Sequence, residues 1–286
     1  MVKEIGRLTD KEEQELIEET KKTLELVQKD DKKGKATLEK LAGCKNYFGR
    51  LIIAETLAKS PLKEELAKNF IKKLLNSHNY AKRATALFFF YYYYDGEPEK
   101  IIDIVSKYYN DIKWEAENIM DQFWKKYPNL MKQNMLKWIE SSDENKRSLS
   151  FHGLGNIAPK DPHFAMEFIE KIIDDESIEV QKKITHTIVQ LARARPADVY
   201  PYLKEWLRDA NEKRIKTIWV SMKKLTSSLT SNGKERNKDF EMLTKETIKD
   251  WKRDKNPKIS TMGEKLYELI THEQNSQKLQ TKKRKR

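Results

Sequence analysis

A helical unit recurs about every 32 residues through the middle of this chain. Five segments with the pattern of a helix start align at residues 82, 114, 146, 181 and 213, so the steps are 32, 32, 35 and 32. A fixed period of this size is typical of solenoids, in which each unit stacks on its neighbour to bury a shared core. Four of the five segments carry Lys or Arg at the first or second position. Stacking therefore predicts a surface of aligned cations, which favours a polyanionic partner.

Each repeat is predicted to be a pair of antiparallel helices. A proline marks most of the turns between the two helices, because proline ends a helix or opens the next one. The expected pairs are 79–94 with 99–109, 114–126 with 129–139, 144–156 with 162–174, and 178–194 with 197–207. The pattern predicts an all-α fold, an α-solenoid of HEAT-like helical repeats.

The flanking segments extend this helical pattern. Before the repeats we expect a helix over 8–29 capped by Thr9 or Asp10, a charged turn over 30–35, and helices over 36–41, 48–59 and 62–75. After Leu225 we expect a loop over 226–238 and closing helices over 239–253 and 259–273. The sequence thus predicts one repeat domain over 1–273 and a basic, disordered tail over 274–286. That tail could be a DNA-grasping arm, a nuclear import signal or a solvated end.

The charge and the cysteine content narrow the class of protein. The formal net charge is +12 and the estimated pI is about 9.3, which favours nucleic acid or anionic lipid as partner, although such charge also serves solubility. Cys44 is the single cysteine, which excludes an intramolecular disulfide and a cysteine-based zinc site and fits a reducing cytoplasm.

Neither a targeting segment nor a metal motif is evident. The first residues have no apolar signal core, and the longest apolar run, 84–94, is too short to span a bilayer. We therefore expect a soluble, cytoplasmic protein. No glycine-rich phosphate loop occurs, and the histidines show no metal-ligand spacing, so we expect neither a metal nor a cofactor. These histidines are His78, His152, His163, His186 and His272.

Three stretches carry a resemblance to a known family. They are 127–141, the helix of Arg147 that follows, and 180–200. Together they resemble the AlkD-like family of bacterial alkylpurine DNA glycosylases, which are built from HEAT-like repeats. The likeness covers about a third of the chain in detail, and the repeat pattern extends it to most of the remainder.

The resemblance implies roles for particular residues. Arg147 matches an arginine that holds the DNA backbone, and Trp114 matches the tryptophan of the family's catalytic pair. The acid of that pair falls at Asn118, and a second tryptophan of the cleft falls at His186. Trp114 and Asn118 are four residues apart, so they share one helix face.

Asparagine at position 118 changes the expected chemistry. Breaking an N-glycosidic bond builds positive charge on the sugar, and a nearby carboxylate stabilises that charge. Asparagine is neutral, and loss of such an electrostatic contribution typically costs about 10²–10³-fold in rate. His186 can stack on a cationic base less strongly than an indole.

Another acid could take the place of the missing one. Asp121 lies seven residues after Trp114, so it falls on nearly the same helix face and could serve. The alternative, which we favour, is a hydrogen bond or ion pair within the repeat. Glu115 and Glu117 point elsewhere on the helix and are expected to face solvent.

The aromatic run Phe88–Tyr94 could stack on bases or fill the core. Seven consecutive aromatic residues on a helix point in all directions, so core packing is expected for most of them. One or two tyrosines could still reach the cleft.

The sequence predicts a monomer that holds duplex DNA, alkylated or otherwise damaged, in a concave basic groove. The expected phosphate contacts are Arg83, Arg147, Lys182 and Arg214. Base excision is expected to be weak or absent. One alternative is an active alkylpurine DNA glycosylase. Another is a protein–protein scaffold, since fold alone does not fix function.

Overall fold

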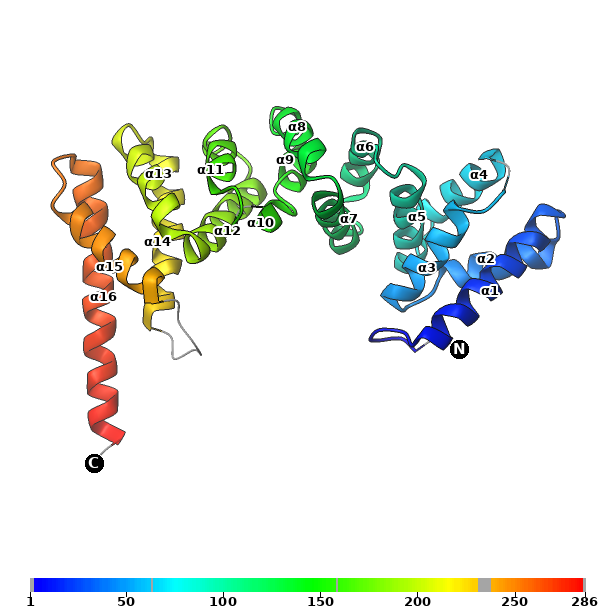
Figure 1. Ribbon diagram of the computed structural model, residues 1–286, viewed down its shortest axis with the longest axis horizontal. Helices are drawn as coiled ribbons and strands as arrows, with labels where there is room; N and C mark the ends of the chain where they lie inside the picture. Colours follow the sequence, from blue (N-terminus) through cyan, green and yellow to red (C-terminus); the bar gives the residue numbers. More distant parts are fainter. Residues whose placement is uncertain (1–2, 63, 158, 231–237, 285–286) are drawn as a thin grey trace. The chain divides into compact units, whose positions relative to one another are not determined.

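The structure, a computed structural model, describes residues 3–62, 64–157, 159–230 and 238–284. Within these residues every regular element is a helix and none is a strand (Figure 1). The chain divides into two compact units, Met1–Asn134 (unit 1) and Met135–Arg286 (unit 2). The boundary falls within α8 (Pro128–Trp138). The prediction of an all-α fold of stacked helical repeats is confirmed.

Unit 1 is built from two rows of helices. Its helices before α8 are α1 (Asp10–Gln28), α2 (Lys32–Ala42), α3 (Tyr47–Ala58), α4 (Glu64–Leu75), α5 (Tyr80–Tyr93), α6 (Pro98–Tyr108) and α7 (Lys113–Lys126). In one row α3 packs on α5 and α5 packs on α7. The other row contains α4 and α6, which pack against the first row: α4 contacts α5, and α6 contacts both α5 and α7. Each helix pair therefore buries its apolar side against the next pair.

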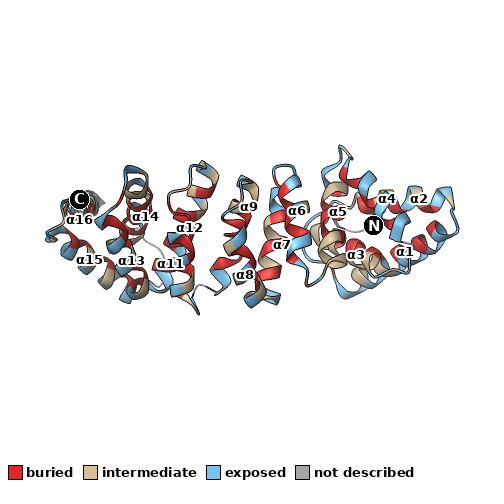
Figure 2. Cartoon of the chain, turned by 90° about the horizontal axis from the view of Figure 1, so that it is seen from above, coloured by how far each residue is buried: buried red, intermediate tan, exposed pale blue. Residues whose placement is uncertain are grey.

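Unit 2 repeats this arrangement. After α8 it contains α9 (Glu144–Leu149), α10 (Leu154–Ile157), α11 (Pro162–Glu170), α12 (Ile178–Ala194), α13 (Pro196–Arg208), α14 (Glu212–Thr230), α15 (Lys238–Lys252) and α16 (Pro257–Arg284). One row runs through α9, α12, α14 and α16, and the other through α11, α13 and α15. Buried residues occur along all these helices where side chains are described (Figure 2). The core of unit 2 lies between its two rows.

The repeat starts coincide with helix starts. The five aligned segments fall at the beginnings of α5, α7, α9, α12 and α14. Side chains that accept hydrogen bonds from the first turn cap several of them, including Asn79 and Ser177. At α1 the cap is Thr9, which forms a reciprocal capping box with Glu12.

Two helix boundaries near glycines differ from the sequence prediction. Helix α2 begins at Lys32, inside the predicted charged turn, because Asp31 caps it and Gly34 lies within it. A Cβ built at Gly34 would lie 2.7 Å from the Cβ of Leu26, so only glycine permits this approach of α2 to α1. The predicted helix over 144–156 is broken into α9 and α10. Gly153, with φ +82°, occupies the left-handed region between them.

The C-terminal helices also run further than predicted. Helix α14 continues through Thr230, into the predicted loop over 226–238, and residues 231–237 of that loop lie outside the described residues. Helix α16 continues through Arg284, because no glycine or proline after Gly263 interrupts it. The end of a helix therefore does not mark the predicted tail boundary at Gln274. The division into a domain over 1–273 and a separate tail stays a prediction.

Candidate functional site

A cavity of about 720 Å³ in unit 1 brings Trp114 and Asn118 together. The two residues and Gln122 follow at four-residue intervals along α7, so they form one stripe on that helix. The indole of Trp114 is 56% exposed, which is unusual for so large an apolar side chain. The cavity is therefore an open site with one solvent-accessible aromatic ring.

Aromatic side chains from α3 and α5 line the same cavity. Tyr47 and Phe48 come from α3, and Tyr91 and Tyr92 come from α5. The ring of Tyr47 lies 4.7 Å from that of Trp114, with the planes at 59°. Burial, and then the charge of Glu115, raises the pKa of Tyr47 to about 12, and burial likewise raises the pKa of Tyr91 and Tyr92. The three tyrosines in these walls are therefore neutral at physiological pH.

The aromatic run on α5 divides between the core and this cavity. Phe88 and Phe89 are buried, as core packing predicts. Tyr91 packs edge-on against the buried Phe123, at 5.2 Å between ring centroids. The expectation that one or two tyrosines reach the cleft agrees with the position of Tyr91 and Tyr92 in the cavity wall.

Glu115 is fully buried, so the expectation that it faces solvent is wrong. One carboxylate oxygen of Glu115 accepts a hydrogen bond from Nη2 of Arg50 at 2.6 Å, and the other accepts one from the hydroxyl of Tyr80. Glu117 is half-buried and accepts a hydrogen bond from the Tyr109 hydroxyl at 2.7 Å. Both carboxylates are therefore engaged in contacts between helices. The sequence did not reveal this because their partners lie on other repeats.

Asp121 does not line the cavity with Trp114 and Asn118. Its carboxylate forms an ion pair with Lys125 at 3.2 Å, one turn further along α7, and its side chain is 35% exposed. This ion pair within the repeat agrees with the favoured expectation for Asp121.

His186 lies on α12 in unit 2 and lines a separate cavity of about 710 Å³. Trp219, Arg193, Lys223 and Lys224 line this cavity as well. Partial burial is the largest cause that lowers the pKa of His186, and the nearby cations Lys183, Lys224 and Arg193 add to it. The lowered pKa favours the neutral form of the His186 imidazole, which lies close to several positively charged side chains. Arg193, Lys223 and Lys224 form no ion pair with any residue in the described part of the chain.

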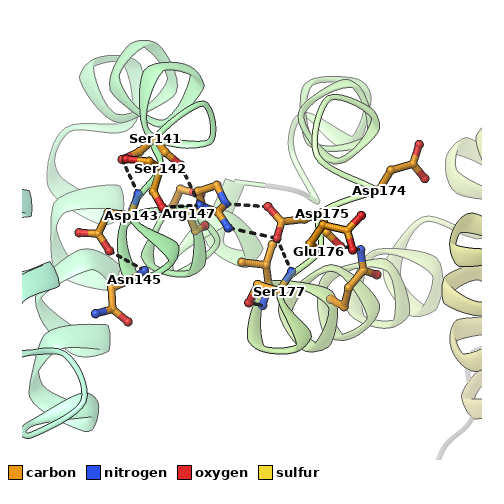
Figure 3. A network of polar contacts seen from close by, with 12 residues as sticks. Ser141, Ser142, Asp143, Asn145, Arg147, Asp174, Asp175, Glu176 and Ser177 are labelled. Atoms are coloured by element: carbon orange, nitrogen blue, oxygen red, sulfur yellow. Dashed lines mark hydrogen bonds and ion pairs between the residues drawn. The ribbon is translucent and has the colours of Figure 1, made fainter.

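Arg147 forms an internal network that links the loop before α9 to the loop before α12 (Figure 3). Its Nε and Nη2 donate to the two oxygens of Asp175 at 2.6 and 3.3 Å. Its Nη1 donates to the carbonyls of Ser141 and Ser142 at 2.8 and 3.1 Å. The Arg147 side chain is 17% exposed and that of Asp175 is 7% exposed. The predicted phosphate contact at Arg147 would have to compete with this network.

A polar side chain recurs in the first turns of several helices, where it donates a hydrogen bond to the backbone carbonyl six residues earlier. Nη1 of Arg147 reaches the carbonyl six residues earlier, and Nη1 of Arg83 does the same with Ser77 at 2.7 Å. Nη1 of Arg50 bonds the carbonyl of Cys44 at 3.3 Å, again six residues earlier. Gln181 makes the equivalent bond to Asp175 through its amide, at 2.9 Å. In α3, α5, α9 and α12 this side chain therefore fastens the start of the helix to the turn that precedes it.

The remaining predicted DNA contacts differ in their exposure. Arg214 donates to both oxygens of Asp174, with Nε at 3.2 Å and Nη2 at 2.5 Å, and its side chain is 25% exposed. Lys182 is 66% exposed and pairs with Glu179 one turn earlier on α12, at 2.6 Å. Of the four predicted contacts, Lys182 is the most accessible to a ligand.

The described residues contain no group of three or more His, Cys, Asp or Glu side chains that could hold a metal ion. Within that part of the chain, no helix combines the length and the apolar character that crossing a bilayer requires.

The comparisons with known proteins give one family match. A family model described as "DNA alkylation repair enzyme" matches residues 10–223. This range includes the cavity residues on α3, α5 and α7 and the arginine network of Figure 3. No curated protein matches the chain.

Proposed function

This chain belongs to the family of DNA alkylation repair enzymes, and from that premise we propose that it binds duplex DNA and excises alkylated bases slowly or not at all. The observation that carries the proposal is the cavity in which Trp114 and Asn118 meet. The aromatic ring suits a nucleoside, but the side chain beside it is an amide. An amide can hold a water molecule, yet it carries no charge to stabilise the cationic transition state of glycosidic cleavage.

The nearby carboxylates do not replace the missing charge. Glu115 is adjacent to Trp114 in sequence, but its charge is balanced by Arg50, and Tyr80 occupies its second oxygen. Glu4, at the cavity wall, pairs with Lys45 at 2.8 Å. Asp121 pairs with Lys125 away from the cavity. A carboxylate whose charge is already balanced by a paired cation stabilises a developing cation less than an unpaired carboxylate would.

DNA binding is supported by the family and by the distribution of charge. The net charge is +12, and three cations that line the His186 cavity have no carboxylate partner among the described residues. These cations are Arg193, Lys223 and Lys224, which together with Trp219 we call the α12–α14 cluster. Unpaired cations contact phosphate without first breaking an ion pair. We therefore place the main phosphate contacts at this cluster and at Lys182, and a lesser share at Arg83, Arg147 and Arg214.

Base release from methylated DNA tests the proposed lack of excision. Wild type should release 7-methylguanine and 3-methyladenine slowly or not at all, and Asn118→Asp should raise the rate by about 10²-fold. Gln122→Glu is the matched control, because it adds a carboxylate to the same cavity one turn further along α7 and should give a smaller gain. Robust wild-type excision would reject the proposal. If Asp121→Asn abolished that excision, Asp121 would be the acid.

A protein–protein scaffold would show no salt-dependent DNA binding.

A further inference from the structure

The cavity in unit 1 contains two amides with no partner. Asn118 and Gln122 are half-buried, and neither side chain forms a hydrogen bond with the part of the chain that the structure describes. Both extend from α7 toward the same cavity as Trp114. An amide offers both donors and an acceptor, so in an open cavity it pairs with water or with a ligand that displaces the water. Two such groups side by side point to a ligand with both donors and acceptors.

The aromatic residues of the cavity are held in place on one side and open on the other. Tyr47 packs edge-on against Phe48 and Phe88, at 5.2 and 5.4 Å between ring centroids. Its tilted contact with Trp114 fixes one side of the indole, while 56% of Trp114 remains exposed. A flat heterocycle can cover such a ring, and stacking on an aromatic side chain is worth about 1–3 kcal/mol per base.

The charges at the cavity are balanced within the protein. Arg50 is 6% exposed and paired with the buried Glu115, and Lys45 is paired with Glu4. No unbalanced carboxylate is available to hold a cationic base, and no unbalanced cation is available to hold a phosphate. The lining therefore favours an uncharged ligand that is aromatic and polar at its edge.

We infer that this cavity takes up a single unpaired adenine, stacked on Trp114 and recognised by the amides of Asn118 and Gln122. An amide side chain can donate to N7 and accept from the N6 amino group of adenine in one bidentate contact. A cavity of about 720 Å³ is of the size that binds small ligands and holds a base with its sugar. The inference rests on the proposed DNA binding for the source of the base. Unpaired bases leave the stack at the least cost, so bulges or mismatches supply the ligand.

The test compares duplexes that differ only at a bulge. One carries a bulged adenine, the second a bulged abasic site, and the third a bulged N-methylated, cationic adenine. Wild type should bind the bulged adenine about 10-fold more tightly than the abasic bulge, as one bidentate contact implies. Asn118→Leu and Gln122→Met should each reduce this ratio toward one. The ratio is internal to each variant, so a general loss of affinity or folding does not mimic the effect.

A matched control and a second readout separate the possible failures. Gln133→Met changes an exposed glutamine on α8 and should keep the 10-fold ratio. Equal affinity for adenine and abasic bulges, or a preference for the cationic base, would overturn the inference and leave DNA binding intact. If no duplex binds, the proposed function fails. Free adenosine then tests the cavity alone, through quenching of tryptophan fluorescence that Trp114→Phe abolishes. No saturable quenching would overturn the inference there too.

Discussion

The guanidinium of Arg147 donates hydrogen bonds to both oxygens of one carboxylate and to two backbone carbonyls. From the sequence alone, its recurrence with Arg83 and Arg214 looked like a row of phosphate ligands. A cation that recurs once in each repeat could bind DNA phosphates, but it could equally bind a backbone carbonyl that recurs once in each repeat. Arg50 could have revealed this, because it precedes Arg83 by 33 residues, which is close to one repeat. Periodicity located the side chains, but it did not identify their partners.

Replacing Arg147 should therefore affect stability first. We expect Arg147→Ala to lower the free energy of unfolding by about 3 kcal/mol, because it leaves Asp175 buried without its cation. Urea unfolding measures the change. Lys182→Ala is the control and should change stability by less than about 1 kcal/mol, since its ion pair is exposed. A loss of DNA affinity in Arg147→Ala with stability unchanged would instead favour a direct phosphate contact.

His186 should make stability depend on pH. Its pKa in the folded protein lies below the usual value of about 6.5, owing to partial burial and to nearby cations. As pH falls through about 6.5, the unfolded chain takes up a proton that the folded protein does not. Stability from this group is therefore fully present above pH 6.5 and declines below it. We expect His186→Gln to lose less stability than wild type between pH 7.5 and 5.5 in thermal unfolding. A steeper decline in the variant would contradict this.

For the individual helices, the apolar pattern together with capping residues and prolines predicted most boundaries to within a residue or two. The bounds of α12 agree with the prediction, because Ser177 caps its start and Pro196 opens the next helix at its end. The predicted boundaries were wrong where tertiary packing or backbone conformation determines where a helix begins or ends. The sequence predicts a charged turn over 30–35, but in the fold Gly34 lies in a helix and permits a close contact with α1. Helix α9 ends early because Gly153 is in the left-handed region, which a periodic pattern of apolar residues does not show.

The break between α9 and α10 gives a paired prediction. Gly153→Ala should lower the free energy of unfolding by about 1 kcal/mol, since an alanine at φ +82° is strained. Gly155→Ala, within the short α10, should be tolerated, because its backbone is helical and the nearest atom is the end of the Gln190 side chain at 3.1 Å. Thermal denaturation of both variants measures the difference. Equal effects would mean that the left-handed backbone is not what the glycine provides.

For the molecule as a whole, the fold class and the family could be predicted from the sequence, but only part of the site could. The resemblance placed Trp114 and Asn118 in one site, and the cavity in unit 1 contains both. It did not include Tyr47, Arg50 or Gln122. Tyr47 and Arg50 belong to the site through contacts between repeats, which spacing within one repeat does not encode. Gln122 continues the stripe of Trp114 and Asn118 along α7, so its four-residue spacing could have revealed it.

The net charge leads to a prediction about DNA affinity and salt. We expect log Kd to rise steeply with log salt, with a slope of about 0.9 for each phosphate contact. The double variant Lys223→Ala, Lys224→Ala should reduce that slope by about 1.8. Lys245→Ala is the control, because its ammonium pairs with Glu241 at 2.5 Å and should leave the slope unchanged. Fluorescence anisotropy with a labelled duplex measures both. An affinity that does not change with salt would reject phosphate binding at the cluster.

The hydrogen bond from the arginine to the carbonyl six residues earlier has a consequence for modular engineering. A helix pair transplanted from this chain into a designed array would keep its function as a building block only if the upstream turn moved with it. For the Arg147 unit, that means cutting before Ser141 and also supplying a carboxylate at the place of Asp175 in the following unit. A consensus repeat that copied the arginine column without those acceptors would carry an uncompensated buried charge in every module.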